Sequence, residues 1–218
     1  MKKYQNEFSS LLEQENKQEA VEYAIELIQS GKMNVIELYS EILTPSLNNM
    51  QCSLQNKNMC VWKEHVRTAI VRTIVECCYP YVIKERDKLS IFTKETAVVI
   101  CPPEEYHDLG ARMIADYISI CGFDVVFVGS NTPFDDFYNA VDIISPKIIA
   151  ISVSNYYNLV VTKKIIADLR KKIKSEVKII IGGYAFLDSL EKVNMVDADY
   201  YAQTFDDIKA IAENEVYV

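Results

Sequence analysis

From residue 95 onward, short apolar runs alternate with longer amphipathic segments, and this alternation limits the choice of fold more than any other feature of the chain. The runs are continuous rather than alternately polar, which is typical of parallel strands with helices on both faces. Strands are predicted at residues 97–101, 124–128, 147–153 and 177–181, with a short fifth strand near Tyr200 and Tyr201. Helices are predicted between them at residues 109–121, 133–144 and 158–172, with a last helix from Asp206. We therefore expect an α/β domain with a flavodoxin-like (Rossmann-like) five-stranded parallel sheet.

Residues 1–87 carry helical patterns only, which predicts a helical bundle before the sheet. Apolar residues recur at three- and four-residue spacing, and helices are predicted at residues 16–30, 35–43, 45–54 and 59–83, the last interrupted near Pro80. The charged run at residues 84–88 is typical of a linker. The predicted domains are therefore a helical bundle over residues 1–87 and a sheet domain over residues 88–218.

Composition excludes several classes of function. The net charge of −8 argues against a direct nucleic-acid surface. No apolar run approaches the about 20 residues that a membrane helix needs, and the N-terminus has no apolar signal core. The six cysteines show no CxxC spacing, so we expect reduced thiols in a cytoplasmic protein.

Three short strings follow predicted strands, and the carboxyl ends of parallel strands are where such sheets bind ligands. The strings are Glu105 to Gly110, Ser152 to Ser154, and Gly182-Gly183-Tyr184. None contains a GxGxxG or P-loop motif for nucleotides, and no GxSxG motif for a nucleophilic serine is present. A phosphorylated receiver would need an aspartate where Ser152 stands. Each string alone also has a simple structural explanation, such as a turn at the glycine pair or a surface position for the histidine.

The chain has only two histidines, His65 and His107. A neutral imidazole is the commonest metal ligand in proteins, and a carboxylate can hold its second ring nitrogen. Glu105 precedes His107 by two residues, and Glu64 directly precedes His65 on a predicted helix. These pairs raise the hypothesis that the two histidines face one metal-bearing cofactor from opposite sides.

Taken together, the three strings resemble the D/ExHxxG, SxL and GG pattern of the cobalamin (vitamin B12)-binding domain. The pattern is found as ExHxxG at residues 105–110, Ser152, and Gly182-Gly183, while Ser154 stands where the family usually has leucine. Gly122, Gly129 and Pro133 agree with further landmarks of the family.

The resemblance implies a cobalamin with His107 as lower axial cobalt ligand in place of the dimethylbenzimidazole. Glu105, or else Asp108, would orient His107, and Gly110 would leave room at the start of the helix. The resemblance implies further cofactor-binding residues around the nucleotide tail: Gly129, Thr132, Ser152, Ser154, Gly182, Gly183 and Tyr184.

The helical half resembles the cap of the MerR-type cobalamin photoreceptor regulators, through Thr44-Pro45, Glu64-His65 and Val71-Arg72. In that branch a tryptophan precedes the Glu-His pair, but Leu54 stands at its position here. The resemblance implies that Leu54, Glu64 and His65 lie at the upper face of the corrin, with His65 as an upper cobalt ligand. Adenosylcobalamin is the form expected first, and methylcobalamin second.

The sequence is compatible with two functions, and neither is enzymatic. The leading hypothesis is a light or cobalamin sensor that acts through cap movement or a change of homo-oligomer on a protein partner, without direct contact with nucleic acid or membrane. The alternative is a corrinoid carrier protein that passes a methyl group between methyltransferases. A third reading is a degenerate cobalamin fold that binds nothing.

Overall fold

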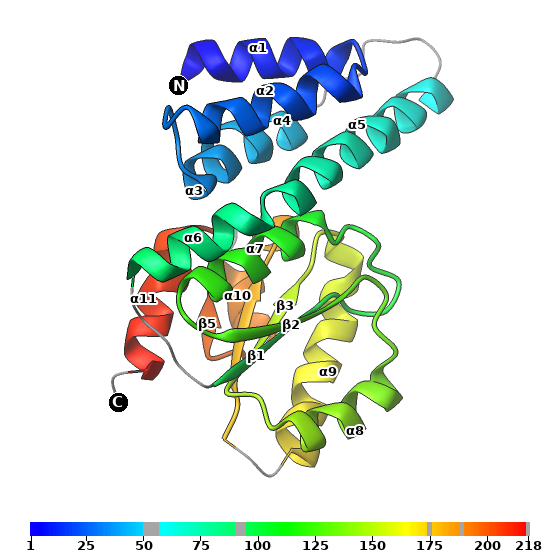
Figure 1. The fold of residues 1–218 in the computed structure, drawn as a ribbon. Helices are drawn as coiled ribbons and strands as arrows, with labels where there is room; N and C mark the ends of the chain where they lie inside the picture. Colours follow the sequence, from blue (N-terminus) through cyan, green and yellow to red (C-terminus); the bar gives the residue numbers. More distant parts are fainter. Residues whose placement is uncertain (50–56, 90–94, 174–175, 188–189, 217–218) are drawn as a thin grey trace. The chain divides into compact units, whose positions relative to one another are not determined.

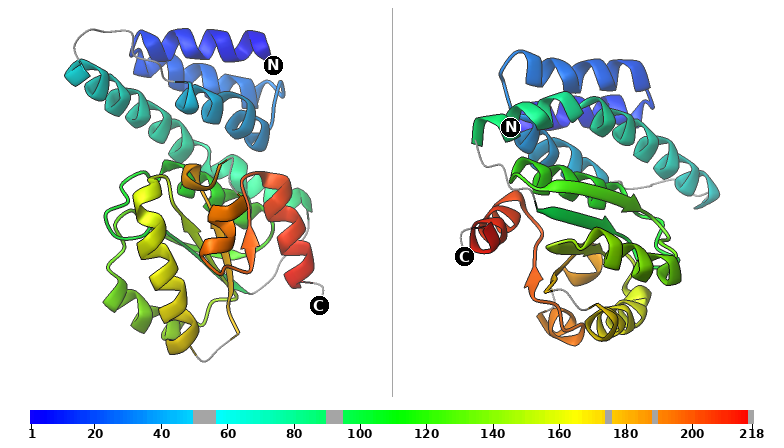
Figure 2. Two further views of the ribbon diagram at one scale, coloured as in Figure 1. Left: turned by 180° about the vertical axis from the view of Figure 1, so that it is seen from behind. Right: turned by 60° about the horizontal axis from the view of Figure 1, so that its bottom comes forward.

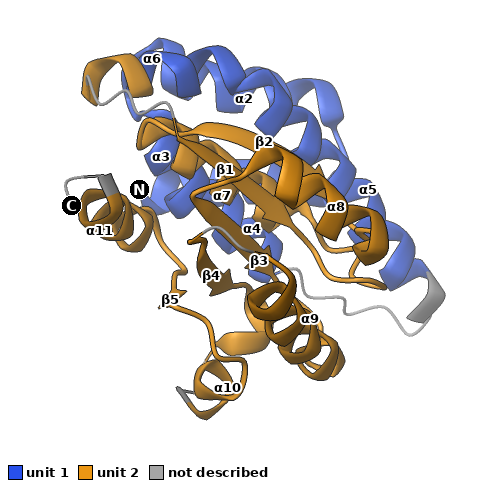
Figure 3. Cartoon of the chain, turned by 90° about the horizontal axis from the view of Figure 1, so that it is seen from below, with its two compact units in different colours: residues 1–85 blue, residues 86–218 orange. Residues whose placement is uncertain are grey.

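The chain divides into two compact units, residues 1–85 and 86–218 (Figure 3). The computed structural model describes residues 1–49, 57–89, 95–173, 176–187 and 190–216. The division falls inside helix α6 (Tyr79–Leu89), so residues 84–88, predicted as a linker, are helical instead. Pro80 lies in the first turn of this helix, where a missing N–H costs nothing, and the preceding helix α5 (Lys57–Cys77) ends just before it.

All the regular secondary structure in the described residues of the first unit is helical. It contains α1 (Lys2–Glu13), α2 (Lys17–Gln29), α3 (Val35–Glu37), a π-helical segment η1 (Leu38–Leu43), α4 (Thr44–Asn48) and α5. Asn34 caps α3 in a reciprocal pair with Glu37, with both hydrogen bonds at 2.8 Å. The π turn ends where Thr44 donates to the carbonyl of Tyr39, immediately before Pro45, which has no N–H to donate. The unit's core includes the fully buried Phe8, Tyr39 and Ile74.

The second unit is built on five parallel strands in the order β2-β1-β3-β4-β5 (Figure 1). The strands are β1 (Thr96–Ile100), β2 (Asp124–Gly129), β3 (Ile148–Ser152), β4 (Lys178–Gly182) and β5 (Tyr200–Tyr201). This order confirms the predicted flavodoxin-like sheet. The chain moves outward from β1 to β2 and then returns to the other side of β1, so the order reverses between β1 and β3. Such a reversal opens a crevice at the carboxyl ends of those two strands.

Helices cover both faces of the sheet, which explains the continuous apolar runs (Figures 1 and 2). They are α7 (Leu109–Ile120), α8 (Phe134–Ile144), α9 (Leu159–Lys172), α10 (Leu190–Met195) and α11 (Phe205–Val216). Val98 and Ile149 pack with residues of α8 and α9, while their neighbours Val99 and Ala150 are buried on the other face. Tyr117 of α7 meets Phe205 of α11 edge to face.

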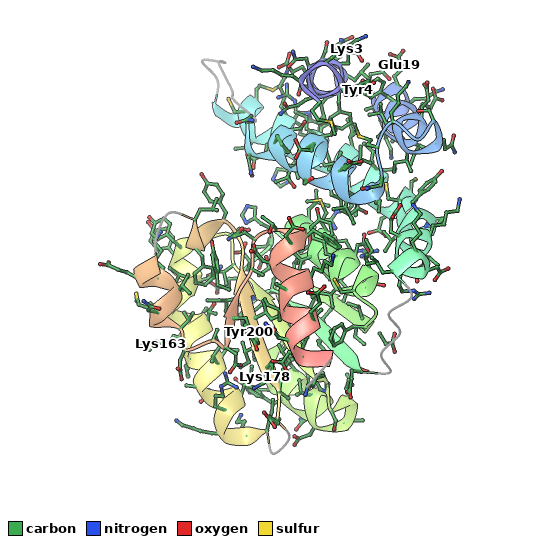
Figure 4. The ribbon with its side chains drawn as sticks, turned by 90° about the vertical axis from the view of Figure 1, so that its left-hand side faces the viewer. Lys3, Tyr4, Glu19, Lys163, Lys178 and Tyr200 are labelled. Carbon is green, nitrogen blue, oxygen red and sulfur yellow. The ribbon has the colours of Figure 1, made fainter. Side chains whose placement is uncertain are left out.

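The short edge strand β5 pairs with β4 and is also joined to the last helix by a side-chain hydrogen bond. Lys178 and Tyr200 lie on the neighbouring strands β4 and β5 (Figure 4). The hydroxyl of Tyr200 donates to Glu215 of α11 at 2.6 Å, which ties the last helix to β5.

The structure bears on the expectations about cysteine oxidation and membrane helices. Cys77, Cys78, Cys101 and Cys121 form no disulfide bond, but Cys60 is disulfide-bonded, which corrects the expectation of a reduced thiol there. Within the described ranges, none of the helices is both long and apolar enough to cross a membrane.

Candidate functional site

The loops after β1, β3 and β4 carry the three sequence strings to one edge of the sheet. β1 neighbours β3, and β3 neighbours β4, so their carboxyl ends are adjacent. Backbone hydrogen bonds also join the last two loops: Val153 donates to the carbonyl of Gly182 at 2.9 Å, and Ala185 donates to that of Val153 at 3.0 Å. The strings therefore form one continuous surface.

Beneath this surface lies the carboxylate of Glu105, whose residue is fully buried. Its Oε1 lies 2.7 Å from Nδ1 of His107 and accepts the His107 backbone N–H at 3.2 Å. Its Oε2 accepts the backbone N–H groups of Ser154 at 3.0 Å and Asn155 at 2.8 Å. The side-chain amide of Asn158 donates to the same oxygen at 3.1 Å. One carboxylate thus joins the loop after β1 to the loop after β3.

These hydrogen bonds decide the charge of Glu105. Burial raises the pKa of its carboxyl, but the N–H groups of Asn155, His107 and Asn158 lower it more, so the pKa lies below its ordinary value of 4.5. Glu105 is therefore an anion at neutral pH and can only accept hydrogen bonds.

The charge of Glu105 in turn fixes the tautomer of His107. Nδ1 must carry the proton that it shares with Glu105, which leaves the lone pair of a neutral imidazole on Nε2. The His107 side chain is 67% exposed, so this nitrogen is accessible to a ligand from outside. A metal that arrives with its other ligands already in place needs only one such nitrogen from the protein. In the ranges that the structure describes, no group of three or more His, Cys, Asp or Glu is arranged to hold an ion.

Asp108 and Gly110 lie at the start of α7, beside His107. Asp108 is the N-cap residue of α7, and Glu105, rather than Asp108, holds the imidazole. A Cβ added at Gly110 would meet nothing within 4 Å, so open space lies over the first turn of the helix. This space suits a bulky group next to the imidazole.

The loop after β2 braces the loop that carries His107. Asn131 donates its N–H to the carbonyl of Glu105 at 3.0 Å, and its side-chain oxygen accepts from Glu104 at 2.9 Å. The hydroxyl of Thr132 is buried and donates to the carbonyl of Gly129 at 3.2 Å. Gly129 and Thr132 therefore stand beside the site, and the Thr132 hydroxyl is already used to close its own turn.

Ser152 and the glycine pair lie where β3 and β4 end, in register with one another. Packing alone accounts for both glycines: a Cβ at Gly182 would lie 2.4 Å from the carbonyl oxygen of Ala202. Gly183 has a φ of 103°, and its Cβ would lie 2.4 Å from the carbonyl oxygen of Val153. Tyr184, the next residue, is exposed.

The candidate residues of the helical part belong to the other unit. Glu64 and His65 are both exposed on α5, as is Trp62. Leu54 lies outside the described residues. The hypothesis that His65 and His107 share one ligand remains a prediction.

Asn158 is the functional candidate that sequence reasoning missed. It is buried, and it directly precedes α9 in a loop that also contains Asn155, the N-cap residue of the short 3-10 helix η2 (Tyr156–Asn158). Two asparagines just after the third strand were the available signal, because asparagine often caps helices and turns. The sequence could not show that the Asn158 amide points at a carboxylate on the loop after β1.

Comparison with known proteins identifies one family and several similar structures. Residues 95–209 match the B12 binding domain. The monomethylamine corrinoid protein of Methanosarcina barkeri superposes with a TM-score of 0.81 at 15% identity, over 98% of each chain. A cobalamin-binding protein of Desulfitobacterium hafniense DCB-2 gives a TM-score of 0.51 at 15% identity, over 96% of this chain and 97% of that one. The methanol:cobalamin methyltransferase complex of Methanosarcina barkeri gives 0.51 at 19% identity, over 96% and 78%. No curated protein matches the sequence.

Proposed function

Because this chain belongs to the B12 binding domain family, and therefore binds cobalamin, we propose that it is a corrinoid carrier protein serving methyltransferases. The observation that carries the proposal is the pair formed by buried Glu105 and exposed His107 at the carboxyl edge of the sheet. This pair offers one oriented imidazole nitrogen, Nε2, with an accessible lone pair that can ligate a metal. In the proposed role, the chain would position and orient a reactive cofactor, and a partner enzyme would carry out the transfer.

The residues present fit a cobalamin bound through its lower face. His107 would ligate the cobalt through Nε2, while Glu105 holds Nδ1 and makes the imidazole a stronger donor. The open space at Gly110 would admit the edge of the corrin, and the nucleotide tail would lie against Gly129, Thr132, Ser152, Ser154, Gly182, Gly183 and Tyr184. The bound cobalt supplies the methyl-carrying chemistry, and the chain supplies position and charge.

Structural likeness supports the carrier over the sensor. One similar structure is a corrinoid protein for monomethylamine, and another is a methanol:cobalamin methyltransferase complex. These proteins suggest a methyltransferase as the partner of this chain, and methylcobalamin as its working form. None of these three similar structures is described as a photoreceptor, so they give the light-sensing hypothesis no support. A regulatory partner and a change of oligomer also remain without support.

The test begins with titration of the purified chain with methylcobalamin, followed by absorbance. Wild type is expected to displace the dimethylbenzimidazole and give a base-off/His-on spectrum. His107→Ala is expected to bind more weakly and to lose the His-on spectrum. The loaded chain is then mixed with cobalamin-dependent methyltransferases of the same organism and a methyl-accepting thiol. Methyl loss that requires both proteins supports the carrier, and tight binding without transfer to any of these enzymes contradicts it.

A further inference from the structure

Four exposed tyrosines surround the site, and the proposed function assigns a role to only one of them. Tyr106 is 67% exposed, Tyr156 57%, Tyr157 72% and Tyr184 65%. They lie on the loops after β1, β3 and β4, which are the three loops that form the site. We call these four residues the tyrosine rim.

Within the described residues of this unit, the exposed tyrosines all lie at that edge. Among the residues described between 86 and 218, the other tyrosines are buried or half-buried, namely Tyr117, Tyr138, Tyr200 and Tyr201. Single exposed apolar side chains are ordinary on a protein surface, but several large ones gathered on adjoining loops mark a surface that something else covers.

The rim is fixed to the Glu105–His107 pair by the hydrogen bonds of the site. Tyr106 lies between those two residues in the chain. Asn155, which donates its N–H to Glu105 at 2.8 Å, directly precedes Tyr156. The side chain of Asn155 also accepts the Tyr157 N–H at 3.1 Å. The backbone that carries three of the tyrosines is therefore held by the same carboxylate that orients His107.

The remaining contacts extend this surface to the fourth tyrosine. The rings of Tyr156 and Tyr157 lie against each other, with centroids 4.1 Å apart and planes inclined by 35°. Tyr184 begins the short helix η3 (Tyr184–Phe186), whose Ala185 bonds to Val153 in the loop after β3. The rim thus continues across the three loops beside an imidazole whose Nε2 is accessible.

We propose that the tyrosine rim is the seat on which the lower face of the corrin rests, an inference that depends on the proposed function. A corrin is a broad and mostly apolar ring with amide side chains at its edge. Tyrosine matches both parts, because its ring covers apolar surface and its hydroxyl can bond an amide. A corrin whose cobalt is ligated by Nε2 of His107 would extend over the neighbouring loops, which carry the four tyrosines.

The inference is tested by the affinity of the purified full chain for methylcobalamin, measured by absorbance titration. Tyr156→Ala and Tyr157→Ala should each weaken binding by about two- to tenfold, which is the range expected for loss of one aromatic contact. The His-on spectrum should persist at saturation, because His107 and Glu105 are unchanged. Tyr156→Phe and Tyr157→Phe should bind more tightly than the alanine variants, since they keep the ring. Ile143→Ala is the control, because Ile143 is 85% exposed but lies on α8, outside the rim.

The outcomes separate this inference from the proposed function. If wild type binds no cobalamin, the proposed function fails, and the rim inference fails with it. If wild type binds and the alanine variants bind equally well, the rim inference is overturned while the proposed function stands. If the variants keep cobalamin affinity but no longer bind a methyltransferase, the rim is a protein-docking surface, which also overturns the inference. All the changes are at exposed positions, and equal unfolding midpoints of the variants exclude a general loss of folding.

Discussion

At the scale of single residues, the unusual feature is an anion with no exposed surface. Burial of a carboxylate is costly unless hydrogen bonds replace its water, and Glu105 has five N–H contacts spread over both of its oxygens. Those donors come from two loops that are about 50 residues apart in sequence. The charge therefore serves the fold and the site together, because it joins the loops and orients His107.

Glu105→Gln should lower the free energy of unfolding at pH 7 by about 1–3 kcal/mol, because one amide nitrogen would then face N–H donors. A depressed folded-state pKa stabilises the protein above the unfolded value of 4.5 and ceases to do so as the pH falls through the folded value. The gap between wild type and Glu105→Gln should therefore shrink as the pH falls below 4.5. Urea unfolding from pH 7 to pH 3 measures the free energy of unfolding of both proteins. A difference between them that stays constant with pH would contradict the argument.

Asn158→Leu should also destabilise the chain, by about 1–2 kcal/mol, because it removes one donor from the buried Oε2 of Glu105 while keeping the branched shape of the side chain. Asn155→Ala is the matched control. Asn155 reaches the same oxygen through its backbone N–H, which alanine keeps, so the variant loses only the hydrogen bond that its side-chain oxygen accepts from the Tyr157 N–H. Equal losses in urea unfolding would show that the Asn158 amide has no special role.

At the scale of elements, the two kinds of glycine in the site have opposite surroundings. Gly182 packs against the carbonyl of Ala202, next to the two-residue strand β5, whereas Gly110 faces open space on α7. Packing therefore requires glycine at residue 182, but it does not require glycine at residue 110. The sequence motifs alone do not show this difference between Gly182 and Gly110.

Substitution by alanine should separate them. Gly182→Ala should lower the free energy of unfolding by at least about 2 kcal/mol, because the added methyl group can be accommodated only by displacing β5. Gly110→Ala should leave stability unchanged or slightly raised, since alanine favours helix. If the space over α7 admits the corrin, Gly110→Ala should instead weaken methylcobalamin binding. Thermal unfolding and cobalamin titration of both variants measure the two effects, and unimpaired binding by Gly110→Ala would contradict that use of the space.

Elements were predicted from sequence more successfully than their contacts. The apolar runs at residues 97–101 and 177–181 are continuous because both faces of the sheet are covered, and this pattern is local enough to read directly. The helical state of the charged run at residues 84–88 could not be predicted, because a solvated helix face and a linker have the same composition. The partners of Glu105 and the neighbours of Gly182 lie far along the chain, so no local pattern contains them.

At the scale of the whole molecule, the carrier and the sensor differ in what they require of the helical unit. Both need His107, but only the sensor needs His65 as an upper ligand after the original one leaves. His65 is exposed on α5. A carrier must instead leave the upper face of the cobalt open to a partner enzyme, so a protein ligand there would hinder its work.

The carrier therefore predicts that His65→Ala leaves methylcobalamin affinity, the His-on spectrum and methyl loss to the methyltransferase unchanged. The same variant, loaded with adenosylcobalamin and illuminated, should change its absorption in the same way as wild type, because breakage of the cobalt–carbon bond would not be followed by binding of His65. Spectra and elution volumes before and after light provide the measurement. A light-induced species that forms in wild type and is missing in His65→Ala, together with a shift in elution volume, would establish the sensor and contradict the carrier.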